Sequence, residues 1–374
     1  MRYPWILLFL CCTTAAFTQV KVNDQPLPQA GDAFLYYLDK LPSNIDPGKA
    51  GAGQRWNFMT LQAPFVRSSS YLTGRQGMNS NRFLEADLTY QVDEATEAYF
   101  RKDAEGLYLL GYYGLDPFGI GIRGLYRYDT PVLSQKKELE YGEGGTYETS
   151  MAALTTLQAL PQSLRDLLPI TPDSIRLRLV SRRMDEVDAW GTMLMPGGFF
   201  DVLREKRSEA RSLRIETKVG SLPWQDITSS LPPNDVFGNH VFLTYLFYSE
   251  NDVEPLMKII MKADNQGVDR VVYQAIEPKG AIQDVLSIRP EVYAYPNPAI
   301  VNVRFEFTNL PTGEYQLSIL NVLGIEIWSK DYFIQNDWAE KVDISFLKKG
   351  TYLYKLKNKE GKILTTRRLV VIRP

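Results

Sequence analysis

The chain has few of the side chains on which most enzyme and metal sites depend. Its 374 residues include a single histidine, His240, and only two cysteines, Cys11 and Cys12. Zinc sites built from several His or Cys ligands, Cys–His nucleophiles and CxxC redox centres therefore lack their residues. A Ser-His-Asp triad would need His240, which lies at an expected strand start without a GxSxG motif, so we interpret it as a turn or edge residue. The sequence predicts no catalytic residue, no cofactor site and no metal site.

Excess charge and long apolar runs are also missing. Lysine and arginine number 42 against 44 acidic residues, a formal net charge of −2, so composition gives no electrostatic reason to expect nucleic acid as a partner. Hydrophobic residues make up 44% and charged residues 23%, which are ordinary values for a globular protein. Beyond the N-terminus there is no apolar run of about 18 residues, so we expect no transmembrane helix in the mature protein.

The N-terminal "MRYPWILLFLCCTTAAFTQ" has the pattern of a secretory signal peptide, residues 1–18. Arg2 gives the positive start, an apolar core follows, and small residues come next. Cleavage after Thr18 would leave Gln19 as the first mature residue, and cleavage after Ala16 is the second choice.

Both cysteines lie inside this segment, so the expected mature chain has none and must be stabilised by its core alone. A lipoprotein reading of Cys11 or Cys12 is disfavoured, because the bulky Phe9 and Leu10 stand where a lipobox has small residues.

Residues 19–285 are expected to form a β-rich passenger domain, with strands separated by turns at spacings typical of sandwiches or barrels. We predict a β-sandwich-like fold in which Trp56 and Phe58 enter the core. Pro196–Gly198 is predicted to be a hairpin turn. Leucines at helical spacing predict one short helix within 157–168, with Pro161 in its first turn and Pro169 at its end.

Several passenger motifs match catalytic or binding patterns by letters alone. The string GIGIRG at 119–124 lacks the βαβ context of a dinucleotide site and is interpreted as loop or strand. The fragment Asp264–Asp269 lacks the remaining ligands of a calcium loop and is interpreted as a hairpin turn. Paired carboxylates could hydrolyse glycosides without His or Cys. The candidates are Glu85 with Asp87 and Asp185 with Asp188, each explained as well by solvated strand faces.

Aromatic residues are the one positive feature of the passenger. They crowd a single segment and could stack on sugars or a partner protein, although core filling is the plainer reading. The residues are Tyr108, Tyr112, Tyr113, Phe118, Tyr126 and Tyr128.

A linker is expected at 286–291. The residues that follow it, 292–374, show a more regular alternation of apolar and polar side chains than the passenger does. Apolar and polar residues alternate in three stretches, 301–307, 315–319 and 352–357, which indicates strands with one buried and one wet face. About seven short strands in this length predict a small immunoglobulin-like β-sandwich. The Pro-Asn-Pro of 296–298 would form a stiff, non-helical approach to its first strand.

This region resembles the type A C-terminal sorting domain of the type IX secretion system of Bacteroidota. The resemblance rests on "YPNPA" (Tyr295–Ala299), "YQLSILNVLGIEIW" (Tyr315–Trp328), "DISFLKKGTYLYKL" (Asp343–Leu356) and "RRLVVIRP" (Arg367–Pro374), in the family's order. The sorting-signal residues that it implies are Pro296, Asn297, Pro298, Gly324, Gly350, Tyr352, Lys355 and Arg373. The family commonly ends on a basic residue, whereas Pro374 follows Arg373 here.

The resemblance implies a destination outside the cell. It implies export through the inner membrane by the signal peptide, then recognition of the tail by the secretion translocon. Removal of the tail by a sortase-like peptidase would follow, with the passenger released or joined to lipopolysaccharide. For the passenger, which is similar in style to uncharacterised passengers of this class, we expect a non-enzymatic surface or extracellular protein that binds glycan or protein. A carboxylate-dependent glycoside hydrolase and a structural envelope component stay open as alternatives.

Overall fold

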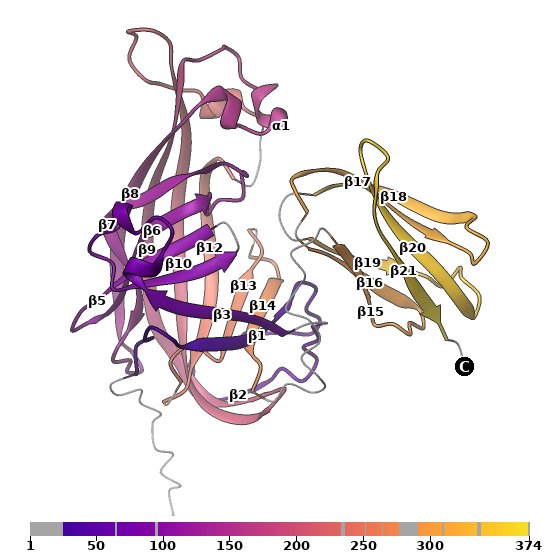
Figure 1. The fold of residues 1–374 in the computed structure, drawn as a ribbon. Helices are drawn as coiled ribbons and strands as arrows, with labels where there is room; N and C mark the ends of the chain where they lie inside the picture. The colour runs from indigo at the N-terminus through magenta and orange to yellow at the C-terminus, as the bar shows by residue number, and fades with distance from the viewer. Residues whose placement is uncertain are drawn as a thin grey trace, which may run out of the picture.

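The computed structural model describes residues 25–63, 66–93, 96–232, 236–250, 252–263, 265–276, 291–308, 310–334 and 338–372. The described chain is dominated by β-strands in two bodies, shown from indigo to orange and in orange to yellow in Figure 1. The first body contains β1 (Ala33–Asp39), β2 (Gly51–Asn57), β3 (Val66–Thr73), β4 (Leu88–Asp93), β5 (Thr96–Lys102), β6 (Gly106–Leu115), β7 (Arg123–Lys136), β8 (Gly144–Thr155), β9 (Ser174–Met195), β10 (Gly198–Lys218), β11 (Gln225–Asp226), β12 (Gly238–Tyr248), β13 (Met257–Met261) and β14 (Val268–Gln274). The second contains β15 (Glu291–Tyr295), β16 (Asn302–Thr308), β17 (Gly313–Leu320), β18 (Glu326–Ile334), β19 (Trp338–Asp343), β20 (Gly350–Asn358) and β21 (Ile363–Val371).

The first body is a closed barrel of 12 strands. Its order is β10-β12-β13-β14-β1-β3-β4-β5-β6-β7-β8-β9, and pairing of β9 with β10 closes the ring. Two short strands attach to it, β11 on β10 and β2 in parallel on β9. The all-β prediction is confirmed, but the β-sandwich-like passenger was wrong.

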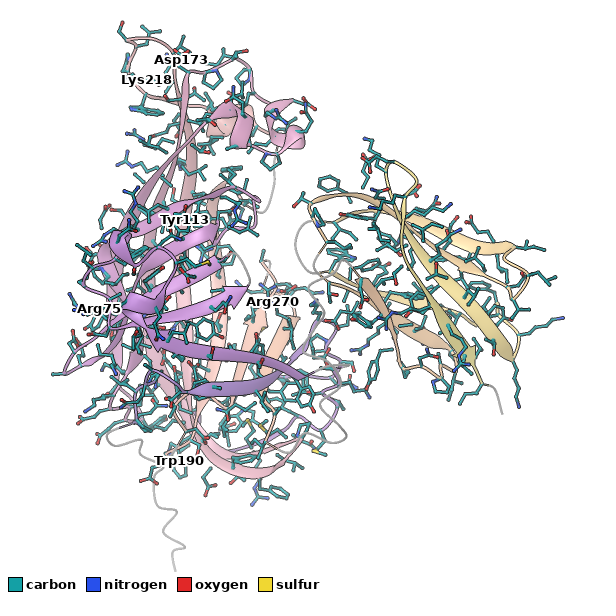
Figure 2. All side chains as sticks on the ribbon, in the orientation of Figure 1. Arg75, Tyr113, Asp173, Trp190, Lys218 and Arg270 are labelled. Carbon is teal, nitrogen blue, oxygen red and sulfur yellow. The ribbon has the colours of Figure 1, made fainter. Side chains whose placement is uncertain are left out.

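The reason for this error is that the alternation of apolar and polar residues along a strand shows which face is buried. It does not show whether the sheet closes on itself into a barrel. A sandwich and a barrel use the same period of two residues. Closure depends on the pairing of β9 with β10, whose partner residues run from Met195 with Gly198 to Ser174 with Lys218. Figure 2 shows this hairpin passing from Asp173 and Lys218 at one end of the barrel towards Trp190 near the other.

The turn of this hairpin lies where the sequence predicts it. Strand β9 ends at Met195 and β10 begins at Gly198. Gly197 has a φ of +115°, a conformation that disfavours any side chain. The two long strands can therefore pair directly from the turn onwards.

The helix expected within 157–168 is reduced to a 3₁₀ turn (Leu157–Ala159) and a single α-helical turn, α1 (Gln162–Arg165). Pro161 stands between them and cannot donate a backbone hydrogen bond, so the helix begins only after it. The predicted apolar spacing still packs, because Leu160 and Leu164 are buried in a cluster with Ile175. Short 3₁₀ turns also occur at Gly74–Gln76, Ser80–Arg82 and Thr228–Ser230.

The second body has two sheets, β15-β16-β19 and β18-β17-β20-β21. Both contribute to one apolar cluster, in which Phe305 and Phe307 of β16 meet Leu317 of β17 and Leu356 of β20. Each of these four side chains is fully buried. Within the described ranges of the whole chain, none of the helices has the length and apolarity needed to span a membrane.

Candidate functional site

Charged side chains gather on one buried face of the β9–β10 hairpin. Arg183 of β9 lies opposite Glu209 of β10, and Asp185 lies opposite Arg207. Glu205 follows on the same face as Arg207, because alternate residues of a strand point the same way. At the start of β9 this face carries the apolar residues Ile175, Leu177 and Leu179. Further along the strand, the residues that point the same way, Arg183 and Asp185, are charged.

Arg207 is the centre of this cluster. Its Nη2 donates to Glu205 Oε1 at 2.7 Å and to the Ser134 carbonyl at 3.2 Å, and its Nε lies 3.3 Å from Asp185 Oδ1. Arg183 Nη2 lies 2.8 Å from Asp185 Oδ2 and also donates to the Leu133 carbonyl. Arg207 therefore bridges two carboxylates, Arg183 contacts one of them, and both guanidinium groups reach β7, which is not a neighbour of either hairpin strand in the sheet.

Burial changes the proton affinity of these groups. It raises the pKa of the Asp185 carboxyl, and nearby Glu205 adds to the rise against the lowering effect of Arg207. Burial lowers the pKa of Arg183, with Arg207 contributing. Burial also favours the neutral form of Glu209, but Arg211 and Ser181 outweigh it, so the pKa of Glu209 is lowered. The cluster holds charge only because each charge has a partner.

A pocket of about 330 Å³, part of it open to solvent, lies over this cluster. Asp185, Glu205 and Arg207 line it together with the turn at Glu143–Gly145 and Tyr147. The Tyr147 ring faces the Arg183 guanidinium at 5.0 Å. Most of the pocket volume is open to solvent, and the free space inside the pocket is about 20 Å³, room for about one water molecule, so a larger ligand would contact the rim of the pocket.

Glycine at position 144 is what brings β8 this close to the hairpin. A Cβ there would lie 2.8 Å from the Asp185 carbonyl oxygen, which is backbone and cannot give way. Sequence reasoning missed this pocket. The available signal was the spacing along β9. Arg183 and Asp185 lie an even number of residues after Ile175 and Leu177, so their side chains point to the same buried face.

A second buried ion pair lies beside it. Arg204 makes two bonds of 2.8 Å to the carboxylate of Asp188, and it also donates to the carbonyls of Pro47 and Gly48. Trp56 Nε1 donates to the same Pro47 carbonyl at 2.8 Å. Arg204 therefore fixes the glycine-rich loop before β2, and Trp56 is buried as predicted.

The two carboxylate pairs suggested by the sequence are not joined into catalytic pairs. Asp185 is held by Arg183 and Arg207, whereas Asp188 is held by Arg204. Glu85 contacts the guanidinium of Arg127, and Asp87 Oδ2 accepts a bond of 2.7 Å from the backbone N–H of Lys102.

The GIGIRG string forms a loop wrapped around a carboxylate of the chain itself. Asp116 accepts backbone N–H bonds of 2.7–2.9 Å from Phe118, Ile120, Gly121 and Ile122. These amides point at Asp116, so they do not form a phosphate cradle. The interpretation as loop or strand is therefore confirmed, because 119–122 form the loop and Arg123 begins β7.

Most of the aromatic segment fills the interior of the barrel domain, as the plainer interpretation held. Tyr126 is buried, and Tyr112, Phe118 and Tyr128 pack against apolar clusters. Tyr108 instead bonds to Glu105 and lies against Arg101.

His240 lies on β12, with Nε2 3.0 Å from the Phe237 carbonyl oxygen. In the fragment 264–269, Asp264 lies outside the described residues, and Asn265 and Gly267 take positive φ angles of 57° and 124° in a turn between β13 and β14. Among residues with described positions, no group of three His, Cys, Asp or Glu is arranged to hold a metal ion.

The sorting-motif residues connect the two ends of the second body. Asn297 Nδ2 donates to the Arg368 carbonyl at 2.7 Å, and its Oδ1 accepts the Val370 N–H at 2.8 Å. Ala299 continues this pairing with Val371. The "PNP" segment and the last strand, β21, are therefore one structural unit, although more than 60 residues separate them.

The other motif residues occupy turns and an outer strand face. Gly324 has a φ of +80° in the turn where Asn321 Oδ1 accepts the N–H groups of Leu323 and Ile325. Gly350 begins β20, and Tyr352 donates its hydroxyl to the Lys348 carbonyl at 2.8 Å. Lys355 lies on β20, between the buried Tyr354 and Leu356. Arg373, Thr18 and Gln19 lie outside the described residues, as does most of the predicted linker.

Comparison with known proteins identifies this second body. Residues 293–372 match the family model described as a secretion system C-terminal sorting domain. No curated protein sequence matches the chain. Two solved structures are similar only weakly. One is PorZ, a surface component of the type IX secretion system of Porphyromonas gingivalis, with 10% identity and a TM-score of 0.21, covering 76% of this chain and 51% of that one.

The other is the trimeric ectodomain of the C. elegans fusion protein EFF-1, with 10% identity and a TM-score of 0.18, covering 92% of this chain and 84% of that one. The chain thus spans about half of the PorZ chain, and neither likeness supports an inference about the barrel. The sorting domain implies export to the cell surface or the surrounding medium. Its presence at 293–372 makes the chain a cargo protein of the type IX secretion system.

Proposed function

We propose that the barrel is a non-enzymatic binding protein, delivered outside the cell by the sorting domain, and that it binds a glycan or a protein. The observation that carries the proposal is the state of the carboxylates in its pocket. Glu205 accepts a bond from Arg207, and Asp185 is ion-paired with both Arg183 and Arg207, so guanidinium groups already engage both carboxylates, which argues against a role in general acid–base catalysis.

The pocket chemistry suits a hydroxyl-rich ligand. Tyr147 offers an aromatic face, the bridged carboxylates accept hydrogen bonds, and Arg207 donates them. A sugar hydroxyl can donate to one partner and accept from another. The pocket is partly open to solvent, although the side chains of Asp185, Glu205 and Arg207 are only 12%, 5% and 18% exposed.

The test is binding by the purified full-length chain on glycan and extracellular-matrix protein arrays, followed by titration calorimetry. We expect Tyr147→Ala to weaken binding about tenfold, which corresponds to loss of one aromatic contact of about 1.4 kcal/mol. Tyr108→Ala, an aromatic substitution outside the pocket, is the matched control. Absence of any ligand across both arrays contradicts the proposal.

One observation favours the glycoside-hydrolase alternative. Burial raises the pKa of Asp185 while Glu205 stays close to it, and a carboxyl of raised pKa beside a second carboxyl is the general-acid arrangement of glycosidases. Turnover of chromogenic glycosides that is abolished in both Asp185→Asn and Glu205→Gln would establish this activity in place of simple binding. Abundance at the envelope with neither binding nor turnover would support a structural component.

We further propose that the N-terminal signal peptide is cleaved near Thr18–Gln19, and that the translocon recognises the tail before a sortase-like peptidase removes it. The passenger is then released or attached to lipopolysaccharide. The family match at 293–372 supports the recognition step.

A further inference from the structure

Strand β16 of the sorting domain meets the end of β1 of the barrel through two ion pairs. Arg304 Nη1 lies 3.0 Å from Asp39 Oδ1, and Lys40 Nζ lies 3.1 Å from Glu306 Oε1. The barrel supplies one acid and one base from adjacent residues. The sorting domain supplies one base and one acid from alternate residues of β16. The two surfaces are therefore reciprocal in charge.

The acidic member of the barrel pair is held in place by the barrel itself. Asp39 Oδ1 accepts the Leu41 N–H at 3.0 Å, and Oδ2 accepts the Gln62 N–H at 2.9 Å. Its side chain is 1% exposed. A carboxylate fixed by two backbone donors keeps its position and has capacity for one more donor, which Arg304 supplies.

The basic and acidic members of β16 are on the side turned away from the sorting domain's own core. Val303, Phe305 and Phe307 enter that core, so Arg304 and Glu306 point out of the opposite face. Glu306 is the one charged residue that is buried among the described positions of the sorting domain. Glu306 is ion-paired with Lys40, and both side chains are less than 10% exposed. Burial of two opposite charges together is the arrangement that keeps their desolvation tolerable.

The contact is bounded by partly open space. A small pocket, with about 10 Å³ of free space, lies between Leu41 and Gln62 of the barrel and Tyr295 and Ala339 of the sorting domain. A larger hollow, with about 480 Å³ of free space, continues past Arg270 towards Trp338. Figure 2 shows Arg270 on the side of the barrel that faces the sorting domain. Polar and incompletely filled contacts of this kind are typical of domain interfaces that can separate.

We propose that the Asp39–Lys40 corner of the barrel is a docking site for strand β16 of the sorting domain, which latches the two domains together in the precursor and leaves the corner uncovered when the domain departs. Weak pairs suffice for such a latch. Both partners belong to one chain, and a short connection gives an effective concentration in the millimolar range, of order 10⁻³ M.

Cysteine cross-linking in the full-length chain beginning at Gln19, which contains no native cysteine, tests the docking. Leu41→Cys with Ala339→Cys places one thiol on each side of the smaller pocket and leaves all four charges intact. A short bis-maleimide should join them at a rate independent of protein concentration. Lys218→Cys with Ala339→Cys is the control, because Lys218 lies at the end of the barrel marked in Figure 2.

Charge exchange tests the mechanism on the same cysteine background. Arg304→Glu with Glu306→Lys reverses both charges of β16 and should slow cross-linking about tenfold or more, since like charges then face each other. Adding Lys40→Glu should recover part of the rate by restoring one attractive pair. Asp39 is left unchanged in this series, because the bonds that it accepts from Leu41 and Gln62 belong to the fold of the barrel.

Rapid cross-linking, its loss on charge reversal and its partial recovery together support the latch. Two results would overturn it. One is a 41/339 rate no faster than the 218/339 control, and the other is a rate unaffected by reversing the charges of β16. Circular dichroism of each variant identifies any that has not folded, and the Lys40→Glu single variant then provides an independent reversal.

Discussion

The barrel and the sorting domain bury different kinds of side chain. The main cluster of the sorting domain consists of apolar and tyrosine side chains from its two sheets. The barrel also has apolar clusters, but its β9–β10 hairpin buries Arg183, Arg204, Asp188 and Glu205. Among its described positions the sorting domain buries one charged residue, Glu306 at its contact with the barrel, whereas the barrel hairpin retains several buried charges, which apolar residues can often replace without loss of stability. That retention points to the hairpin as the place where the passenger's function lies.

The largest effect should follow from breaking a buried pair of the barrel. Arg204→Met leaves the Asp188 carboxylate buried without its two bonds, and we expect a loss of about 4 kcal/mol in the free energy of unfolding. Arg178→Met is the control, because that side chain is 57% exposed and should change stability by less than about 1 kcal/mol. Chemical denaturation measures both. Adding Asp188→Leu to Arg204→Met should recover most of the loss, and failure to recover would show that the pair itself is not what matters.

A matched substitution in the sorting domain should act only there. Leu317→Ala removes a fully buried side chain from the sorting-domain core and should cost about 3 kcal/mol. Calorimetry of the full-length chain should show one transition lowered while the transition of the barrel stays in place. An equal shift of both transitions would mean that the two bodies unfold as one.

A smaller loss is expected from the motif that closes the sorting domain. Asn297→Ala removes the bonds to Arg368 and Val370 and should cost about 2 kcal/mol, at roughly 1 kcal/mol for each bond. Asn297→Asp keeps the acceptor for the Val370 N–H and should lose about half as much. Export measured in the native host should fall in the same order. Full stability of Asn297→Ala together with failed export would assign Asn297 to recognition instead of folding.

The smallest effect concerns pH and is specific to the barrel. The pKa of Glu209 is lowered in the folded state, so this residue binds protons more weakly there than in the unfolded chain. It therefore adds stability above its unfolded pKa of about 4.5, and that contribution is lost as the pH falls through the lower folded value. The stability difference between the native chain and Glu209→Gln should shrink below about pH 4.5 in denaturation series. A difference that is constant from pH 7 to pH 3 would contradict the lowered pKa.

The apolar core of the sorting domain could be predicted from the sequence more completely than the partly charged interior of the barrel. Residues 301–307 alternate cleanly, and the structure places Val303, Phe305 and Phe307 in the sorting-domain core. The sorting domain was recognised correctly from motifs that include Tyr295–Ala299 and Arg367–Pro374, and the structure pairs Asn297 of the first motif with Arg368 and Val370 of the second. In the barrel, Trp56 and Phe58 were correctly placed in the core.

The barrel's closure and pocket could not be predicted in the same way. Arg183 and Asp185 occupy positions of β9 whose side chains point to the buried face. Because both are charged, a prediction from hydrophobicity nevertheless assigns them to solvent. Besides the β9–β10 hairpin, the closed ring requires β1 to pair with β14, where Tyr36 lies opposite Gln274, and no local pattern specifies this long-range pairing. The sandwich expected for the passenger was therefore a reasonable inference from strand spacing, and it was wrong at the level of long-range pairing.

The central claim is that this chain is exported cargo whose sorting domain is a detachable address. Intact mass spectrometry of the native protein from the cell surface and the medium tests it most directly. We predict a species that begins near Gln19 and ends before about Val292, alone or with the added mass of lipopolysaccharide. A mature extracellular species that retains residues through Pro374 would contradict removal of the tail and would make residues 293–372 a permanent working domain.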